Sequence, residues 1–530
     1  MDEIESILSH FSSDTMNEKS EDIFNLLKIL LSNDKTKVIA LDADVGERTI
    51  NYFKGINKKI KVINNKYTKD TIKINLTNNL DYFIDDIKQR LIKNEKICII
   101  GLSTKILYSI SGMLDEMKIK YIMHTRDSDD KLKKDITDVN ELWKKYQCVL
   151  YSPTITVGID HTITYFDAVY SIIIPNTAPP RVYIQMLGRI RNLKNNNILT
   201  YYEGTNVSIN KYLYNYEEIK KYFKYVDTLI KTKSEYKYDE HGNLNMINDY
   251  NLYNIIMMHN RIEDLNKTSE YFMTQLNTLC NQNNYKLVFI HKDNIRANVQ
   301  KDIKKELKDD KYKEKIINAK IITKEEYLII GEKINNSEAL ESEKFSFLLY
   351  KFKKFWLIDE QIDINIFNKY FRNEINMNRL FILLGKKTVG EYCDKDIKLK
   401  INIIREIINK LGFDTNFLIK IDKEIYYNNV KKLLTDSDFS QNYDKVGILF
   451  GKSKSKLNIN MNGHSLAVFL NNFLGEFGLY IKQNKTTKKI DNKTVNICNF
   501  QLKILDNYND ILNKYIIKEK KELPINLFKK

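Results

Sequence analysis

Lys96-Ile-Cys-Ile-Ile-Gly101, followed by Ser103-Thr104, decides the fold class because it joins a short apolar run directly to a helix start. An uninterrupted apolar run of this length is typical of a strand buried on both faces. Serine or threonine before an amphipathic stretch caps the first turn of a helix. A strand that leads into a helix in this way is half of a βαβ unit. The segment therefore predicts a parallel sheet with helices around it.

The same strand signature recurs on both sides of this segment. Upstream, apolar runs at Lys37–Asp42 and Lys59–Ile63 enclose a short helical stretch at Arg48–Phe53. Three further strands are expected downstream, at residues 121–124, 147–151 and 168–174. The alternation continues over the first 205 residues and predicts an α/β fold. Ligands of such sheets bind at the carboxyl ends of the strands, so polar residues that follow the strands are candidate site residues.

Composition places the chain among globular proteins of several domains. It has 530 residues, of which 43% are hydrophobic, and can bury several cores. Its five cysteines are scattered without a close pair, which argues against a disulfide framework or a zinc site and favours a reducing, intracellular compartment. No apolar run approaches the roughly 20 residues that cross a bilayer. The acidic start MDEIESILSH is unlike a signal peptide. We therefore expect no membrane partner.

Arginine, more than net charge, marks the strongest candidate site. The charge of +16 comes mostly from lysine, and the bias toward Lys, Asn, Ile and Tyr is typical of an AT-rich genome, which weakens charge as a sign of nucleic acid. Yet Arg181, Arg189 and Arg191, three of the chain's eleven arginines, fall within eleven residues. A guanidinium binds phosphate through two hydrogen bonds at once, which an ammonium does not do. The segment is predicted to be helical, with Gln185 on the same face as Arg189.

A turn rich in hydroxyl groups follows the strand predicted at 147–151. It reads Ser152-Pro-Thr154-Ile-Thr156-Val-Gly158-Ile-Asp160-His161 and holds one glycine at which the backbone could approach a ligand closely. Alone, such a turn is most often the punctuation between a strand and a helix. The arginine segment that comes next along the chain makes it a candidate site.

These segments, taken in order, resemble motifs of a superfamily 2 helicase of the origin-binding-protein type, known from herpesviruses, giant DNA viruses and some eukaryotes. SPTITVGIDH, YFDAVYSI and PRVYIQMLGRIRN are similar to motifs V and VI. Lys37–Phe53 resembles the motif III region, Lys96–Lys105 resembles motif IV, and Asp2-Glu3-Ile-Glu5 resembles the DExE box of motif II. The resemblance implies the C-terminal portion of an ATP-dependent DNA helicase and replication origin-binding protein. It also implies ATP and Mg²⁺ as cofactors, DNA as a partner, and a viral replication site in the host cell.

The resemblance assigns roles at the amino-terminal end. It implies that Asp2 and Glu3 hold Mg²⁺ and orient the attacking water. Asp42 and Asp44 would couple the nucleotide site to the nucleic-acid site. The alternative for this pair is that the Asp-Ala-Asp segment only caps the helix that begins near Glu47.

Further roles fall on the two later segments. The resemblance implies that Thr154 and Thr156 contact the nucleic-acid backbone. The nucleotide would be contacted by Gly158, Asp160, Gly188 and Arg181, and the γ-phosphate by Gln185, Arg189 and Arg191. In the commoner helicase form the second arginine comes three residues after the first, whereas here it comes two after, which turns a helical side chain by about 100°. Which arginine acts in catalysis stays open, Arg181 included, and a basic surface helix is the alternative.

The chain contains no G-x-x-x-x-G-K-[ST] segment, the loop whose backbone and lysine hold the β- and γ-phosphates. We expect little ATP hydrolysis by this chain alone. Either another chain or an upstream segment carries the loop and completes a working helicase, or the chain is a catalytically inactive DNA-binding or scaffold protein derived from one. A partial sheet in residues 1 to about 65 would expose an apolar edge and face, which parallel sheets do not tolerate, so these residues are expected to need another chain or an upstream segment as a partner.

Four regions are predicted along the chain. Residues 1–65 are expected to be a remnant of the first RecA-like domain, 66–205 the second RecA-like helicase domain, 206–445 a mostly helical region, and 446–530 a basic α+β module. The last 80 residues carry 15 Lys against 6 Asp plus Glu, more than a uniform lysine bias gives.

The basic module has the outline of a winged helix. A helix at 465–474 is followed by strands at 478–481 and 495–500, with a basic loop between them. Four lysines of that loop would neutralise DNA phosphates: Lys482, Lys485, Lys488 and Lys489. A solvated basic module without a DNA partner is the alternative.

Overall fold

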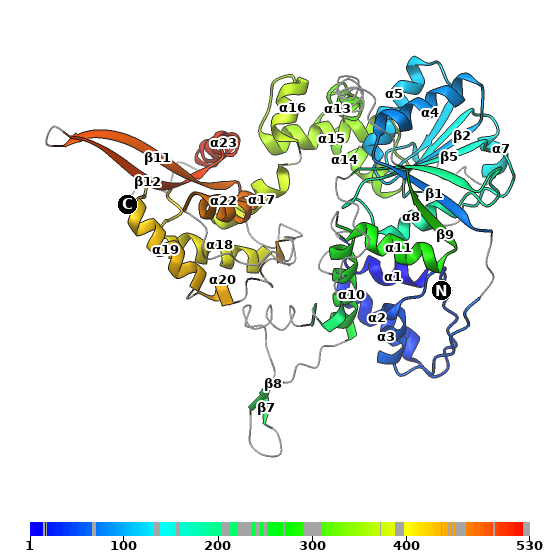
Figure 1. Cartoon of the computed structure of the whole chain (residues 1–530), viewed down its shortest axis with the longest axis horizontal. Coiled ribbons are helices and arrows are strands. Elements are labelled where there is room, and N and C mark those ends of the chain that lie inside the picture. The colour runs from blue at the N-terminus through cyan, green and yellow to red at the C-terminus, as the bar shows by residue number, and fades with distance from the viewer. Residues whose placement is uncertain are drawn as a thin grey trace. The chain divides into compact units, whose positions relative to one another are not determined.

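The computed structural model of the chain (Figure 1) describes these residues: 1–13, 16, 19–65, 70–131, 138–154, 159–203, 213, 215–217, 219–220, 236–238, 244–246, 252–268, 271–290, 310–371, 373–386, 397–435, 437–441, 443, 446, 449–450, 463–490 and 493–522. They form two compact units. The first comprises Met1–Tyr216, Asn251–Phe352 and Ile362–Ile364, and the second Glu217–Tyr250, Lys353–Gln361 and Asn365–Lys530. Residues 206–445 thus contribute to both units.

A parallel sheet of seven strands forms the centre of the first unit (Figure 1), in the order β3-β4-β2-β5-β6-β1-β9. Its strands are β1 (Ile72–Thr77), β2 (Ile97–Gly101), β3 (Tyr121–His124), β4 (Cys148–Tyr151), β5 (Ala168–Ile173), β6 (Asn197–Tyr202) and β9 (Tyr285–Phe289). All six pairings are parallel. The predicted α/β fold is confirmed, together with the four predicted strands that became β2, β3, β4 and β5.

Helices cover both faces of this sheet. On one face α4 (Leu80–Ile92) and α5 (Thr104–Glu116) pack over side chains such as Ile97 and Ile99. On the other, α7 (Val139–Trp143), α8 (Pro180–Leu187) and α11 (Phe272–Gln282) pack over the alternate side chains, such as Ile100. Both faces are therefore buried, which explains why strands such as β2 and β4 are apolar runs.

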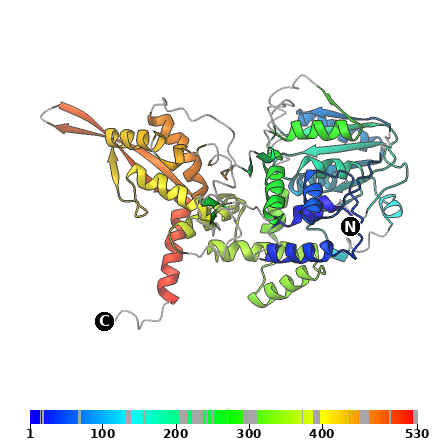
Figure 2. The ribbon, with the colours of Figure 1, turned by 90° about the horizontal axis from the view of Figure 1, so that it is seen from below.

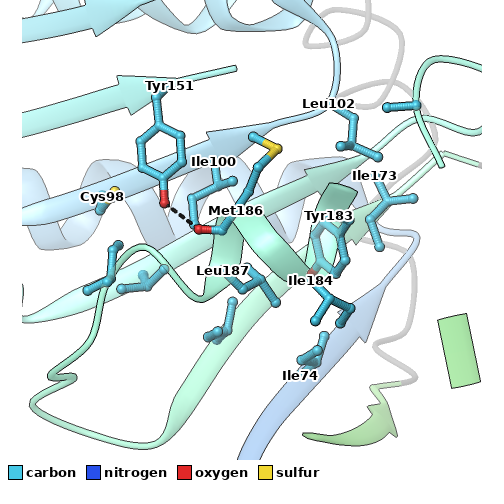
Figure 3. Packing of buried hydrophobic residues seen from close by; sticks show 14 of the residues in the cluster. Ile74, Cys98, Ile100, Leu102, Tyr151, Ile173, Tyr183, Ile184, Met186 and Leu187 are labelled. Atoms are coloured by element: carbon cyan, nitrogen blue, oxygen red, sulfur yellow. Dashed lines mark hydrogen bonds between the residues drawn. The ribbon is translucent and has the colours of Figure 1, made fainter. Parts of the chain in front are cut away.

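Helix α8 is fixed to the sheet by packing and by one hydrogen bond (Figure 3). Tyr183 and Met186 are fully buried in the same cluster as Ile100 and Ile173. The hydroxyl of Tyr151, at the end of β4, donates a hydrogen bond of 2.8 Å to the carbonyl oxygen of Met186. The residues that follow α8 are therefore held at the carboxyl end of the sheet.

The strands predicted at residues 37–42 and 59–63 are wrong. The described residues of 1–65 form α1 (Ile4–His10), α2 (Ser20–Ser32) and α3 (Glu47–Gly55), with no assigned strand. The amino group of Met1 donates to the Ile39 carbonyl over 2.6 Å, and the Leu41 amide donates to the Met1 carbonyl over 2.8 Å. This short contact is not a ladder, and the side chains of Ile39 and Leu41 are 73% and 57% exposed. A strand needs a neighbouring strand to complete its ladder of backbone hydrogen bonds, and these two apolar runs have no such neighbour among the described residues.

The second unit is built around an antiparallel sheet in the order β10-β12-β11. Its strands are β10 (Lys420–Asp422), β11 (Leu479–Ile490) and β12 (Lys493–Ile504). Three of its helices are α18 (Ile397–Leu411), α19 (Lys423–Thr435) and α22 (Gly463–Leu474). Helix α18 buries one apolar stripe, in which Ile397, Ile404 and Leu411 are fully buried. Gly412 follows with a φ of 86°, as a C-terminal cap requires.

Figure 2 shows β11 and β12 as a long hairpin, with α22 just before it in the chain. The predicted helix and two strands are confirmed, but the predicted basic loop is wrong, because residues 482–489 belong to β11 and pair with residues 494–501 of β12. Adjacent threonines, Thr486 and Thr487, favour the extended backbone there. The connection at 491–492 lies outside the described residues.

Other described elements are α10 (Leu252–Asn266), α13 (Asp310–Ile317), α14 (Lys324–Asn335), α15 (Glu341–Trp356), α16 (Ile364–Tyr370), α17 (Glu374–Leu383), α20 (Asp438–Gln441), η3 (Gly475–Phe477), α23 (Asp506–Glu522), β7 (Tyr236–Tyr238) and β8 (Leu244–Met246). In Figure 1, α10 lies beside α1, α2 and α3, and it contacts all three. Among the described helices, none is long and apolar enough to span a membrane.

Two buried histidines flank Trp143 near the carboxyl end of the sheet. The Trp143 indole donates a hydrogen bond of 3.1 Å to Nε2 of His124, and the His161 ring stacks on Trp143 with centroids 5.3 Å apart. Burial lowers the pKa of His124 to about 4, and burial together with the charge of Lys144 lowers the pKa of His161 to about 4. Both rings are therefore neutral at neutral pH.

Acid is expected to destabilise the first unit through these two rings. The unfolded chain binds a proton at each histidine below about pH 6.5, whereas the folded chain does so only near pH 4, so stability is lost as pH falls between these values. We expect the free energy of unfolding to fall by about 2 kcal/mol per histidine between pH 7 and pH 5. Urea unfolding at both pH values measures this. If His124→Gln combined with His161→Gln shows the same pH 7 to pH 5 loss as the natural chain, other groups are responsible.

Candidate functional site

The arginine segment is a helix followed by an extended stretch. Helix α8 begins with Pro180, and Gly188 forms its C-cap. Beyond it, the His161 amide donates to the Arg189 carbonyl over 2.8 Å, and the Arg191 amide donates to the His161 carbonyl over 2.9 Å. These bonds draw the chain out of the helix. Arg189 and Arg191 therefore lie beyond the helix, so the predictions that Arg189 belongs to it and that Arg191 is turned by a helical angle are wrong, although Gln185 and Arg189 both approach Glu3.

Asp160 holds both arginines that follow the helix. Nη2 of Arg191 donates to both carboxylate oxygens of Asp160 at 2.9 Å, and Nη1 of Arg189 donates to one of them at 3.2 Å. Burial opposes ionisation of Asp160, but the two guanidiniums outweigh it and hold its pKa below the usual range. Asp160 and the two arginines, which the sequence analysis assigned to the same nucleotide site, are thus in direct contact.

Glu3, near the amino terminus of the chain, approaches the same segment. Nε2 of Gln185 donates to Glu3 over 2.8 Å. Nη2 of Arg181 lies 3.6 Å from a Glu3 oxygen, and Nη2 of Arg189 lies 3.7 Å from the other. The arginine side chains are only 10% and 11% exposed. The structure therefore brings Glu3 into contact with the arginine segment, a region that the sequence predicted separately from it.

Asp42 anchors Arg181. Its side chain is completely buried and forms an ion pair with Nη2 of Arg181. It also accepts hydrogen bonds of 2.9 Å from the backbone amides of Glu5 and Asp44. Burial raises the pKa of Asp44, with the charge of Arg181 opposing this and that of Asp42 adding to it. Asp42 thus joins the start of α1, the loop before α3 and helix α8.

The cap of α3 comes from Glu5, a residue that the sequence analysis left without a role. Oε1 of Glu5 accepts hydrogen bonds from the Gly46 amide at 2.9 Å and from the Thr49 hydroxyl at 2.5 Å. The alternative in which Asp42 and Asp44 cap this helix is therefore wrong. The only sequence feature that marked Glu5 as a candidate was its place as the last acid of Asp2-Glu3-Ile-Glu5.

Arg48 was also missed. Its Nε donates to Oε2 of Glu5 over 2.9 Å, and its Nη1 contacts Asn260 at 2.7 Å and Glu263 at 3.1 Å. Arg48 and Glu5 are 6% and 4% exposed. Two of the partners come from α10, more than 200 residues along the chain, which sequence spacing does not reveal.

The remaining predicted residues lie elsewhere or outside the described residues. Asp2 is exposed and accepts a hydrogen bond of 3.2 Å from the amide of Glu3. Thr154 is exposed in the turn after β4. Thr156 and Gly158 fall outside the described residues. The four predicted DNA-binding lysines all lie on β11 of the second unit, with Lys482 and Lys485 exposed.

Residues 68–214 match the family model described as origin of replication binding protein. This part of the chain carries a domain that matches that model, and we refer to it as the origin-binding domain after the model's description. It contains β1 to β6 and the whole arginine segment, whereas Glu3 and Asp42 lie outside the matched range and contact the domain from upstream.

The names of similar proteins are consistent with this family match. The chain is 31% identical over 526 residues to an Acanthamoeba polyphaga mimivirus protein named as an uncharacterized helicase, covering 87% of this chain and 48% of that protein. A second mimivirus protein, named as a replication origin-binding protein, is 31% identical over 54% of this chain and 38% of its own length. The replication origin-binding protein of human herpesvirus 7 (strain JI) is 27% identical over 38% and 26%. The chain thus spans half or less of the curated relatives it matches.

Proposed function

We propose that this chain supplies the arginine side of an ATP site in a helicase of the origin-binding type that acts in viral DNA replication. One observation carries the proposal. Glu3 and Asp42, from one end of the chain, converge on Arg181, Gln185 and Arg189 of the origin-binding domain. The names of the relatives support a helicase and origin-binding role in general.

Arg189 is the arginine that we assign to the γ-phosphate. It is 9% exposed and lies between Asp160 and Glu3, whereas the Arg191 side chain is 40% exposed and pairs with Asp160. A charge held in a partly dry site stabilises developing negative charge more strongly than one in water. Arg181 has a positioning role, because its ion pair with Asp42 ties α8 to the loop before α3.

The donor groups suit a nucleotide with its metal ion. When bound, ATP would supply the transferable phosphoryl group and Mg²⁺ would neutralise charge on its oxygens. Mg²⁺ is commonly held by one or two carboxylates together with phosphates. Asp2 and Glu3 offer that number, and no cluster of three or more metal-ligating side chains occurs among the described residues. We propose that the phosphate loop comes from a polypeptide outside these 530 residues.

Reconstitution tests this function. The chain is mixed with a polypeptide that carries a G-x-x-x-x-G-K-[ST] loop and is encoded in the same genome, and ATP hydrolysis is measured with and without DNA. We expect DNA-stimulated hydrolysis by the mixture and almost none by either part. The control replaces the loop lysine by alanine in the added polypeptide. DNA binding without any hydrolysis in the mixture would support the inactive DNA-binding or scaffold protein.

A further inference from the structure

The sheet of the second unit has one basic, polar face. Directly paired residues of antiparallel strands project to the same side, and alternate residues of a strand share a side. Lys420 of β10, Gln501 of β12 and Lys482 of β11 are paired in one row across the three strands. We call the side to which this row belongs the lysine face. Among the side chains that the structure describes, it carries Lys420, Asp422, Tyr480, Lys482, Asn484, Thr486, Asn499, Gln501 and Lys503.

The opposite face is apolar and packed, which fixes the direction of the lysine face. Ile421, Phe500 and Leu502 alternate with the residues of the lysine face and are 6%, 0% and 1% exposed. Tyr426 of α19 stacks on Phe500 with ring centroids 4.0 Å apart. Helix α19 therefore covers the apolar side, and the lysine face points away from it. On the lysine face, Lys420 and Lys482 are exposed, whereas Gln501 between them is 6% exposed and donates a hydrogen bond of 2.9 Å to the Phe417 carbonyl oxygen.

Lysines on the two outer strands flank the amide side chains of the face, of which Asn499 and Gln501 lie on the central strand β12 and Asn484 lies on β11. Neighbouring strands lie about 4.8 Å apart, so Lys420 and Lys482 stand on backbones separated by about 10 Å. The major groove of duplex DNA is about 12 Å wide, with phosphates along both rims and base edges between them. Asn499 accepts a hydrogen bond of 3.2 Å from Asn484, and both are half-buried. Amide side chains are suited to the hydrogen-bonding edges of bases.

We propose that the lysine face binds duplex DNA in its major groove, with Lys420 and Lys482 on phosphates of opposite rims and Asn484 and Asn499 toward the base edges. This rests on the DNA-binding part of the proposed function. Proteins that hold single-stranded DNA stack successive bases on several aromatic side chains. Among the described residues of the lysine face, Tyr480 is the one aromatic side chain and Asp422 is the one carboxylate. The row of two lysines around amides therefore favours the duplex.

A charge-matched pair of variants tests the lysine face. The full chain is titrated with a labelled duplex and with one of its single strands, by fluorescence anisotropy at several salt concentrations. The test variant is Lys420→Gln with Lys482→Gln. The control is Lys431→Gln with Lys432→Gln, which removes the same charge from exposed positions of α19 on the other side of the sheet.

We expect the test variant to lose duplex affinity by on the order of tenfold to a hundredfold at about 0.1 M salt, and the slope of log affinity against log salt to flatten by about 2. The control should retain the slope of the natural chain. Equal losses in both variants would overturn the proposal, as would a loss confined to the single strand or no measurable duplex binding. Because the titration needs neither ATP nor the phosphate-loop polypeptide, failure of the reconstituted ATPase does not affect its outcome.

Discussion

Arg189→Ala is expected to lower the DNA-stimulated ATP turnover of the reconstituted assembly by about a thousandfold, the usual scale of effect for an arginine that stabilises phosphoryl-transfer charge. The reason is the position of its guanidinium, which is nine-tenths buried between Asp160 and Glu3. Loss of this group leaves the transition-state charge without a preorganised partner. Steady-state hydrolysis with saturating DNA measures the change.

Two other arginines serve as comparisons for Arg189. Arg191→Ala is expected to lower turnover by about tenfold or less, because a half-exposed guanidinium is screened by water. Arg90→Ala removes an arginine of α4 that pairs with Asp86 and Glu95, outside the site, and should leave turnover unchanged. Equal effects at Arg189 and Arg191 would contradict the assignment of Arg189 to the γ-phosphate.

Arg48→Ala is expected to destabilise the packing of α1, α3 and α10 by about 3–5 kcal/mol, the usual cost of removing one partner from a buried ion pair. The carboxylate of Glu5 would stay buried without the guanidinium that neutralises it, and Asn260 and Glu263 would lose their shared donor. Urea unfolding followed by limited proteolysis of the amino-terminal residues measures the loss.

The partly exposed Arg90 gives a reference for the stability lost when Arg48 is replaced. Arg90→Ala breaks ion pairs whose side chains are about one-third exposed, and such pairs contribute about 1 kcal/mol or less. Arg48→Met with Glu5→Gln removes both charges and should recover part of the stability lost by Arg48→Ala. If Arg48→Ala costs no more than Arg90→Ala, Arg48 does not hold these helices together.

Apolar runs made much of the parallel sheet predictable, because a strand buried on both faces cannot carry polar residues. Strands β2, β4 and β5 were expected for this reason. Strand β1 was missed because it alternates polar and apolar residues, and β9 because it joins the sheet from residues 285–289, beyond a segment that belongs to the second unit. No local pattern reveals such a return of the chain.

The candidate site was predictable in its residue types but not in its contacts. Arginines in a lysine-rich chain marked α8, and the resemblance marked Glu3 and Asp42. The end of α8 at Gly188 depends on backbone hydrogen bonds to His161, which no periodicity encodes. Glu5 and Arg48 went unassigned because they bond to each other across 43 residues and because the other partners of Arg48 lie on α10. The lysines of β11 were predicted to lie in a loop because of the polar composition there. Pairing with β12 outweighs that composition.

The most direct test of the arginine side of the ATP site compares the affinity of the assembly for ADP with its affinity for ADP and fluoroaluminate, an analogue of the phosphoryl-transfer transition state. The natural assembly should bind the analogue at least about a hundredfold more tightly than ADP, since catalytic groups bind the transition state more strongly than the ground state. In Arg189→Ala this preference should disappear, while ADP affinity stays the same. An unchanged preference in Arg189→Ala would contradict the claim that this arginine faces the γ-phosphate.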